Sequence, residues 1–357
     1  MSKEDSKRVG VLTLYGEYNY GNRLQNYAVV QSLAKMGFKA ETLVATKRNI
    51  FLYKTKRLAL MILDGLFSGV IKKTKPSVSK FVNFYRFTRK NIPTRYIQTK
   101  SGVLPNSISS KYDFFVTGSD QVWNTTLGYS DQEYRNYLLE FAAPEKRYCF
   151  SPSFGISYVD ERWENELANE LNKFVSLNVR ESAGVDLVKN LTQREDVISV
   201  IDPTLMLNKE DWLKVSKPVK NLPQKFTVDY FLGETPSDNE AYQYASKGCP
   251  KIRLLNKEDV DIYTSGPSEF IYLISKADMV CTDSFHACVF SILFEKPFVV
   301  FKRDDGTKDM FSRIETLLGL FGINATDNIG KTIKLDKDAR DRVLSQERKK
   351  LVACFLK

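Results

Sequence analysis

Histidine is nearly missing from this sequence, since His286 is the single one among 357 residues. The five cysteines are odd in number and none has the spacing of metal ligands, so a zinc centre built by the protein is not expected. Cysteines of this kind indicate reduced thiols and therefore the cytoplasm. The first eight residues lack the apolar core of a signal peptide, and no uncharged apolar run reaches the ~18 residues that cross a bilayer.

Acidic residues are outnumbered by basic ones, 43 against 53, which gives a formal net charge of +10 and a pI near 9.1. This excess suits an anionic small ligand, a membrane surface or nucleic acid. No RRM, KH or zinc-finger motif is present, so we expect no nucleic-acid partner. At 41.0 kDa the chain exceeds what one hydrophobic core usually fills, and two domains are expected.

The basic residues concentrate in residues 47–95, which contain thirteen lysines and arginines and a single acid, Asp64. Apolar and aromatic side chains are interspersed at helical spacing, which predicts two helices. A basic amphipathic stretch is typical of a surface that binds a membrane or an anionic ligand. It is also typical of two helices that pack on a core and turn their lysines and arginines to solvent.

Strand-like and helix-like segments alternate along most of the chain. Residues 8–14 alternate as a strand does, 22–36 have helical apolar spacing, and 39–44 form the next strand-like run. Such alternation favours parallel sheets. We therefore predict an α/β fold of two Rossmann-like domains that face a cleft.

The predicted domain limits follow this pattern. The first domain is expected over residues 1–185, with 47–95 as a helical insertion, and the second over 186–334. Residues 335–357 are expected to form a C-terminal helix that packs back on the first domain.

His286 follows a strand-like run, 279–282, and the polar turn Asp283–Ser284, and it opens an apolar helix. Open α/β sheets bind ligands outside the carboxyl ends of their strands. Histidine can exchange a proton near neutral pH at its ordinary pKa. His286 is therefore a candidate catalytic residue, with a structural histidine as the alternative.

A glycine-containing loop also opens the helix predicted at 22–36. The backbone N–H groups and the positive dipole end of such a helix suit an anion, so Asn19, Gly21, Asn22 and Gln25 are candidate binding residues. The loop is neither a Walker loop nor a GxGxxG motif, so it specifies no nucleotide. The alternative is a turn that Asn22 caps.

A third polar cluster directly follows the buried strand predicted at 112–117. Ser119, Asp120 and Gln121 offer donors and acceptors for sugar hydroxyls, and Trp123 offers a ring face for stacking. The alternative is an Asx turn that caps a helix.

Arg180 stands just past a further predicted strand. A guanidinium binds a carboxylate or a phosphate through two parallel hydrogen bonds. The alternative is a surface ion pair with Glu181.

Seven short motifs occur in one order along the chain. They are YGNRLQNYA (20–28), GSDQVWN (118–124), SPSFG (151–155), VRE (179–181), DPT (202–204), GPSEF (266–270) and TDSFH (282–286). Together they resemble the polysaccharide pyruvyl transferase family over residues 8–320. The resemblance implies a fold similar to the two-domain GT-B glycosyltransferase architecture.

The same resemblance implies transfer of pyruvate from phosphoenolpyruvate, as a ketal, to two hydroxyls of a sugar in a cell-surface polysaccharide precursor such as an exopolysaccharide. Phosphoenolpyruvate would be a co-substrate, with no cofactor and no metal. The acceptor saccharide can be lipid-linked, in which case residues 47–95 would contact the inner face of the membrane.

By resemblance, His286 and Arg180 match positions that bind phosphoenolpyruvate, His286 as general acid or phosphate ligand and Arg180 as a clamp for carboxylate or phosphate. Ser284 stands where some characterised members have arginine. Another cation, Lys302, Arg303 or Arg313, would then supply the charge. The alternatives are a nucleotide-sugar glycosyltransferase of the same architecture and a family member that binds glycan without turnover.

Overall fold

The structure is a computed structural model that describes residues 6–16, 18–245, 247–303 and 311–356. The chain forms two compact units, and each is described by itself. Unit 1 comprises Met1–Leu58, Thr88–Leu207 and Glu347–Lys357. Unit 2 comprises Ala59–Phe87 and Asn208–Gln346.

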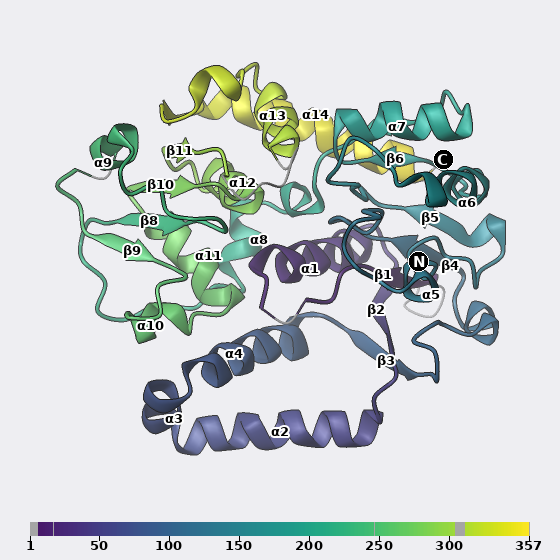
Figure 1. The fold of residues 1–357 in the computed structure, drawn as a ribbon, viewed down its shortest axis with the longest axis horizontal. Helices are drawn as coiled ribbons and strands as arrows, with labels where there is room; N and C mark the ends of the chain where they lie inside the picture. The colour runs from purple at the N-terminus through teal and green to yellow at the C-terminus, as the bar shows by residue number, and fades with distance from the viewer. Residues whose placement is uncertain (1–5, 17, 246, 304–310, 357) are drawn as a thin grey trace. The chain divides into compact units, whose positions relative to one another are not determined.

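Unit 1 is built on a parallel five-stranded sheet of order β3-β2-β1-β4-β5 (Figure 1). Its strands are β1 (Arg8–Leu12), β2 (Lys39–Thr46), β3 (Thr94–Gln98), β4 (Phe114–Thr117) and β5 (Arg147–Cys149). The central strands are apolar, and all four residues of β4 are buried. The strand order reverses between β1 and β4, which is where such sheets bind ligands.

Helix α1 (Tyr20–Lys35) follows β1. Its N-cap is Asn19, whose side chain accepts a hydrogen bond from the Asn22 N–H at 3.1 Å. The helix stops before Gly37, which has a left-handed φ of 91° that glycine adopts without strain.

Unit 1 continues to Leu207, beyond residue 185, where the sequence placed the end of the first domain. Helix α6 (Glu161–Leu171) packs on α7 (Ser182–Thr192), and a small parallel pair forms between β6 (Asn178–Val179) and β7 (Ile198–Ser199). These contacts join the stretch after residue 185 to the one before it.

The last helix, α14 (Lys337–Phe355), begins in unit 2, and its residues from Glu347 belong to unit 1. There the ring of Phe355 lies 5.2–6.2 Å from four aromatic rings of the sheet and its border. These rings belong to Phe38, Phe114, Tyr148 and Phe150.

Unit 2 holds a second five-stranded sheet, of order β12-β11-β10-β8-β9, in which only β12 is antiparallel. Its strands are β8 (Thr227–Tyr230), β9 (Lys251–Arg253), β10 (Met279–Thr282), β11 (Phe298–Val300) and β12 (Thr332–Ile333). Helices α11 (Pro267–Lys276), α12 (Phe285–Leu293) and α13 (Ser312–Gly319) alternate with them. The strand order reverses between β8 and β10. The prediction of two Rossmann-like α/β domains is therefore confirmed.

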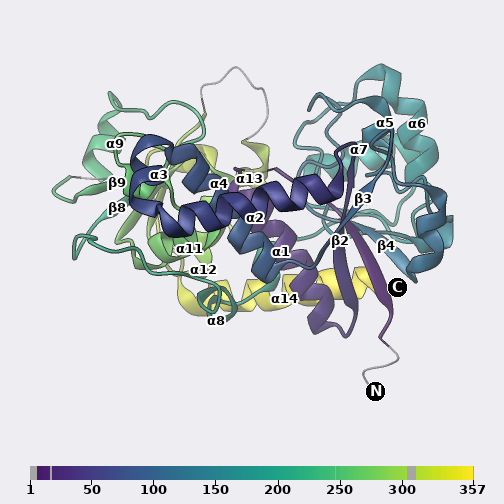
Figure 2. The ribbon, with the colours of Figure 1, turned by 90° about the horizontal axis from the view of Figure 1, so that it is seen from below.

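The basic segment forms three helices where two were predicted, namely α2 (Ile50–Leu66), α3 (Ser68–Thr74) and α4 (Pro76–Asn91) (Figures 1 and 2). Helices α2 and α4 are held together by Asp64, which accepts hydrogen bonds from Ser79 Oγ at 2.7 Å and Arg86 Nη1 at 2.8 Å. The prediction missed the break near Phe67 and the strand β3 that follows. Within the described residues, no helix has the length and apolar character needed to cross a membrane.

Within unit 2, helix α4 packs against the segment that leads into α11. The side-chain amide of Asn83 donates to the Thr264 carbonyl at 2.8 Å. A Cβ at Gly266 would lie 2.9–3.2 Å from Asn83 atoms, so this glycine of the GPSEF motif is explained by close packing.

Candidate functional site

Five of the seven motifs meet in unit 1, outside the carboxyl ends of β1 and β4. The Gln25 amide donates to Thr13 Oγ1 at 2.7 Å, and Thr13 Oγ1 donates to the Ser119 carbonyl at 2.7 Å. The Asn22 amide donates to the Asp120 carboxylate. The structure thus brings together the loop into α1 and the turn after β4, which the sequence alone presents as two separate candidate sites.

Asp120 has a left-handed φ of 73°, which is uncommon for a residue other than glycine. Its carbonyl accepts from the Ser153 N–H at 2.9 Å. The SPSFG loop is held from its other side by Glu181, whose Oε1 accepts from Ser153 Oγ at 2.7 Å and from two backbone N–H groups. A Cβ at Gly155 would lie 2.5 Å from the Gln121 side chain, so only glycine fits there.

Arg180 is buried among three carboxylates. Its Nη1 lies 2.7 Å from Asp202 Oδ2, Nε lies 3.8 Å from Glu181 Oε2, and Nη2 lies 4.0 Å from Asp120 Oδ1. Burial acts to lower the pKa of Arg180, but the Asp202, Glu181 and Asp120 carboxylates outweigh it and raise that pKa. Asp202 also accepts from Ser119 Oγ at 3.1 Å.

This setting differs from the one expected for a substrate clamp. The side chain of Arg180 is only 2% exposed and faces acids that repel an anionic ligand. In this structure Arg180 contacts the DPT turn through Asp202 and the GSDQ turn through Asp120. The three carboxylates around the Arg180 guanidinium come from three different turns and belong to Asp120, Glu181 and Asp202.

Trp123 requires a correction. The predicted sugar-stacking ring is fully buried, lies 5.5 Å from the Phe154 ring and 5.7 Å from the Phe174 ring, and donates its indole N–H to the Tyr137 carbonyl at 3.2 Å. It is a core residue, because the turn after β4 folds inward.

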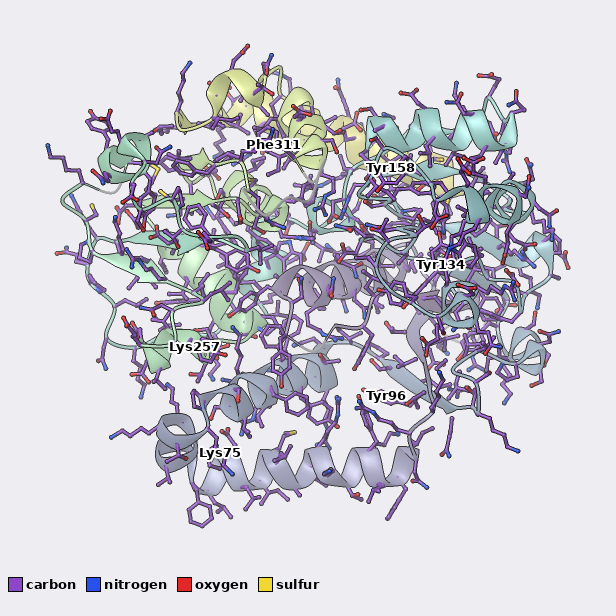
Figure 3. The ribbon with its side chains drawn as sticks, in the orientation of Figure 1. Lys75, Tyr96, Tyr134, Tyr158, Lys257 and Phe311 are labelled. Carbon is purple, nitrogen blue, oxygen red and sulfur yellow. The ribbon has the colours of Figure 1, made fainter. Side chains whose placement is uncertain are left out.

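A cavity of about 480 Å³ opens beside this network in unit 1, at the carboxyl ends of β1, β2 and β3. Five tyrosines line it together with polar side chains that include Arg48, Asn22, Glu133 and Asn136. The tyrosines are Tyr15, Tyr53, Tyr96, Tyr129 and Tyr137; Tyr96, on β3, is labelled in Figure 3.

Burial raises the pKa of three of the tyrosines that line this cavity, Tyr96, Tyr129 and Tyr137. Burial, followed by the charge of Asp120, raises the pKa of Tyr129 to about 12. Burial also raises the pKa of Tyr96, whose hydroxyl shares a 2.7 Å hydrogen bond with that of Tyr15. The cavity therefore offers ring faces and neutral hydroxyls, which suit a saccharide.

Sequence reasoning missed Tyr15, Tyr53 and Tyr96. They come from three segments, and their meeting depends on β3, which was not predicted. The one available signal was the density of tyrosine around the loop before α1, where Tyr15, Tyr18 and Tyr20 occur.

Unit 2 carries the TDSFH motif at the junction of β10 and α12. Asp283 accepts from the Leu232 N–H at 2.7 Å, the Gly233 N–H at 2.8 Å and Arg303 Nε at 3.0 Å. It thereby ties together the ends of β8, β10 and β11. A Cβ at Gly233 would lie 2.7 Å from Arg303 Cγ, so glycine leaves room for this arginine.

His286 lies in the first turn of α12, where Ser284 is the N-cap and makes no side-chain capping bond. The His286 ring is mostly buried and stands perpendicular to the Phe285 ring at 5.2 Å. The Arg313 guanidinium lies 6.0 Å from the Phe285 ring centre. Ser284 stands where some family members have arginine, and three cations were considered as substitutes for it. Two of them, Arg303 and Arg313, lie near this helix start.

The two cysteines beside this motif, Cys281 and Cys288, are buried, and burial disfavours the thiolate form. Burial raises the pKa of Cys281 to about 12 and also raises the pKa of Cys288. In the described parts of the chain no three His, Cys, Asp or Glu side chains gather as metal ligands would, and we assign no metal site.

Two Rossmann-like units, each with polar motifs at its strand ends, define a two-domain α/β protein. Residues 19–305 match the family described as polysaccharide pyruvyl transferase, and the chain belongs to that family. The family is one of transferases that act on polysaccharide. No curated protein matches the sequence.

Several solved structures are similar over nearly the full chain. Anabaena HepE, in complex with UDP and glucose, is 12% identical, covers 98% of this chain and 95% of its own, and has a TM-score of 0.42. A glycosyltransferase from Rickettsia africae is 7% identical, with coverage of 98% and 94% and a TM-score of 0.46. The UDP-GlcNAc 2-epimerase of Neisseria meningitidis is 11% identical, with coverage of 98% and 99% and a TM-score of 0.41.

Proposed function

We propose that the protein transfers pyruvate from phosphoenolpyruvate to two hydroxyls of a saccharide, forming a ketal in a cell-surface polysaccharide precursor. The observation that carries the proposal is the TDSFH motif, with His286 in the first turn of α12 and two arginines nearby, in a chain of this family. A helix start with adjacent guanidinium groups suits a donor that has both a carboxylate and a phosphate.

The reaction requires proton transfer to carbon. A proton adds to the methylene carbon of phosphoenolpyruvate, and one sugar hydroxyl oxygen bonds to the adjacent carbon. The C–O bond to phosphate then breaks, and the second hydroxyl oxygen closes the ketal. One hydroxyl proton replaces the proton given to the methylene carbon, and the other leaves with phosphate, so no further reactant is needed.

His286 is the proposed acid for the methylene carbon, because imidazole can donate a proton near pH 7. Arg303 and Arg313 are the proposed anion ligands. Arg180 takes a different role from that expected, since its contacts with Asp202 make it a positioning residue for the turns of unit 1.

The tyrosine-lined cavity of unit 1 is the proposed site for the acceptor saccharide. Its neutral hydroxyls and amides pair with sugar hydroxyls, while Asn22 links it to the Asp120 turn. A lipid-linked acceptor would place the protein at the inner face of the membrane.

Donor binding is tested by calorimetry with phosphoenolpyruvate alone and, separately, with UDP-glucose. We expect phosphoenolpyruvate to bind, and Arg313→Ala to weaken it at least about tenfold. Binding of UDP-glucose without phosphoenolpyruvate would instead indicate a glycosyltransferase, and binding of neither would indicate a glycan-binding member without turnover. Either result overturns the proposal.

Turnover is tested by phosphate release from phosphoenolpyruvate with a panel of p-nitrophenyl hexosides, and the ketal is detected by mass spectrometry. His286→Ala should lower the rate at least about 100-fold while leaving the unfolding temperature unchanged. Lys276→Ala is the matched control. This exposed residue ends α11 just before the amino end of β10, whereas His286 follows the carboxyl end of the same strand. Near-normal turnover in His286→Ala would remove histidine from the mechanism.

A further inference from the structure

Helix α2 turns most of its large apolar side chains to solvent, whereas a helix that packs on a core buries them. Six large apolar side chains are 43–77% exposed, and the helical repeat places them within an arc of about 140°. They are Phe51, Leu52, Leu58, Ile62, Leu63 and Leu66. The opposite face is turned inward and holds Arg57 and Asp64, both buried.

The apolar surface continues into α3, where Phe67, just before the helix, and Val70 are 55% and 62% exposed. Helix α3 has no buried residue, and Lys72 and Lys73 lie in its last turn. We call these eight apolar residues of α2 and α3 the exposed apolar face. Exposed apolar surface of this extent marks an interaction site.

Basic residues border the exposed apolar face. Lys54 and Lys56 are exposed on α2, and Lys73 and Lys75 are exposed on α3 and just after it. Figure 3 labels Lys75 at the junction of α3 and α4. The one acid of the segment, Asp64, is buried and bound by Ser79 and Arg86, so it does not offset this positive charge.

We propose that the exposed apolar face docks on a lipid bilayer rich in anionic phospholipid. Apolar side chains flanked by lysines match an interfacial helix, whose apolar side enters the bilayer while the ammonium groups reach the headgroups. Anionic lipid adds attraction at each lysine. A second copy of the chain is disfavoured as occupant, because it would bring lysines against lysines.

The same helix borders the proposed acceptor cavity. Tyr53 of α2 and Arg48 just before it line the cavity, within unit 1. Helix α2 would therefore face lipid with its exposed apolar side and line the cavity that receives a saccharide with its opposite side, at Tyr53. This last link rests on the proposed function, whereas docking on the bilayer does not.

The test is flotation of the full chain with vesicles of phosphatidylcholine alone or mixed with phosphatidylglycerol. We expect binding to the mixed vesicles. Combining Phe51→Ser, Leu58→Ser, Ile62→Ser and Leu66→Ser should reduce that binding at least about tenfold. The matched control combines Leu232→Ser, Tyr244→Ser and Leu255→Ser, which change exposed apolar residues elsewhere in unit 2 and should leave binding unchanged.

A second variant tests the charge. Combining Lys54→Gln, Lys56→Gln, Lys73→Gln and Lys75→Gln should weaken binding to the mixed vesicles at least about tenfold and reduce its dependence on salt. Absence of vesicle binding by the wild-type chain, or binding that the serine variant retains, would overturn the proposal. A concentration-dependent dimer that only the serine variant loses would reassign the face to self-association.

Calorimetry with phosphoenolpyruvate separates this proposal from the proposed function. The serine variant should bind phosphoenolpyruvate as the wild type does, since His286 and both arginines are unchanged. Failure of vesicle binding therefore leaves the donor result standing, and failure of donor binding leaves the vesicle result standing.

Discussion

Asp202 joins three side chains of the buried cluster in unit 1, Arg180, Ser119 and Thr204. It accepts from Arg180 at 2.7 Å and from Ser119 at 3.1 Å, and its other oxygen accepts from Thr204 Oγ1 at 2.6 Å. Removing one partner of a buried ion pair leaves the other charge without compensation. The stability of this turn therefore depends on Asp202.

Asp202→Ala should lower the free energy of unfolding by about 3–5 kcal/mol, as measured by urea denaturation. Asp196→Ala is the control, because Asp196 pairs with Arg194 at 2.6 Å but is 57% exposed, and the expected loss is below about 1 kcal/mol. Equal losses in the two variants would contradict the role given to Asp202.

At the residue scale, sequence reasoning identified Asn22 and Gln25 as one candidate cluster and Ser119 and Asp120 as another, because each segment follows a strand. It did not foresee that Arg180 is enclosed by carboxylates, because Asp120 and Asp202 are distant along the chain and meet it only through the fold. The order of strands in a sheet predicts which turns lie close together. It does not predict which side chains of those turns pair.

Lys80 shows how an element inside the insertion is held in unit 2. It lies on α4, is buried, and places its ammonium 4.6 Å from the centre of the Tyr263 ring. Burial lowers the pKa of Lys80 from 10.5 to about 8. Below pH 8 the folded protein therefore carries a buried charge that the unfolded chain exposes to water.

Between pH 8 and 10.5 the unfolded chain binds a proton that the folded protein has lost, so the free energy of unfolding should rise with pH over that range, by about 3 kcal/mol. Lys80→Met should abolish this rise and be the more stable protein at pH 7. The measurement is urea denaturation of both proteins across this pH range, with the free energy of unfolding of the variant subtracted from that of the wild type at each pH. Parallel curves would show that Lys80 is not the cause.

At the element scale, the strands β1, β4 and β10 were predicted because their apolar runs are bounded by polar turns. Strand β3 was missed because Thr94–Gln98 is an edge strand, and most of its residues are only partly buried. Helix α2 was assigned correctly as a helix, but its exposed apolar face follows from the inward turn of Arg57 and Asp64, which composition does not reveal.

Unit 1 as a whole is assembled from three separate stretches of chain, the last of which begins at Glu347. Phe355 joins this stretch to the sheet through contacts with four rings, and it is 2% exposed. A buried phenylalanine contributes through the apolar area it removes from water and through the space it fills.

Phe355→Ala should lower the free energy of unfolding by about 3–5 kcal/mol. Leu356→Ala is the control, since its neighbouring side chain is 57% exposed and its loss should have little effect. Denaturant unfolding followed by tryptophan fluorescence measures both. Similar stability in the two variants would show that α14 does not complete unit 1.

At the scale of the whole molecule, alternation of strands and helices was sufficient to predict two parallel sheets. The limits of the units were harder, because the chain crosses between them at Leu58, Phe87, Leu207 and Gln346. A linear reading assigns each stretch to the domain around it in sequence, whereas packing assigns 59–87 to unit 2. The cleft, and the convergence of His286 with Arg180, stay predictions.

The route of the chain also constrains how the protein is made. A ribosome releases the first five strands long before Glu347–Lys357 emerges, so the rings of Phe38, Phe114, Tyr148 and Phe150 lack their final cover during translation. Those four rings would therefore stay exposed to water until Phe355 has been synthesised and packs over them.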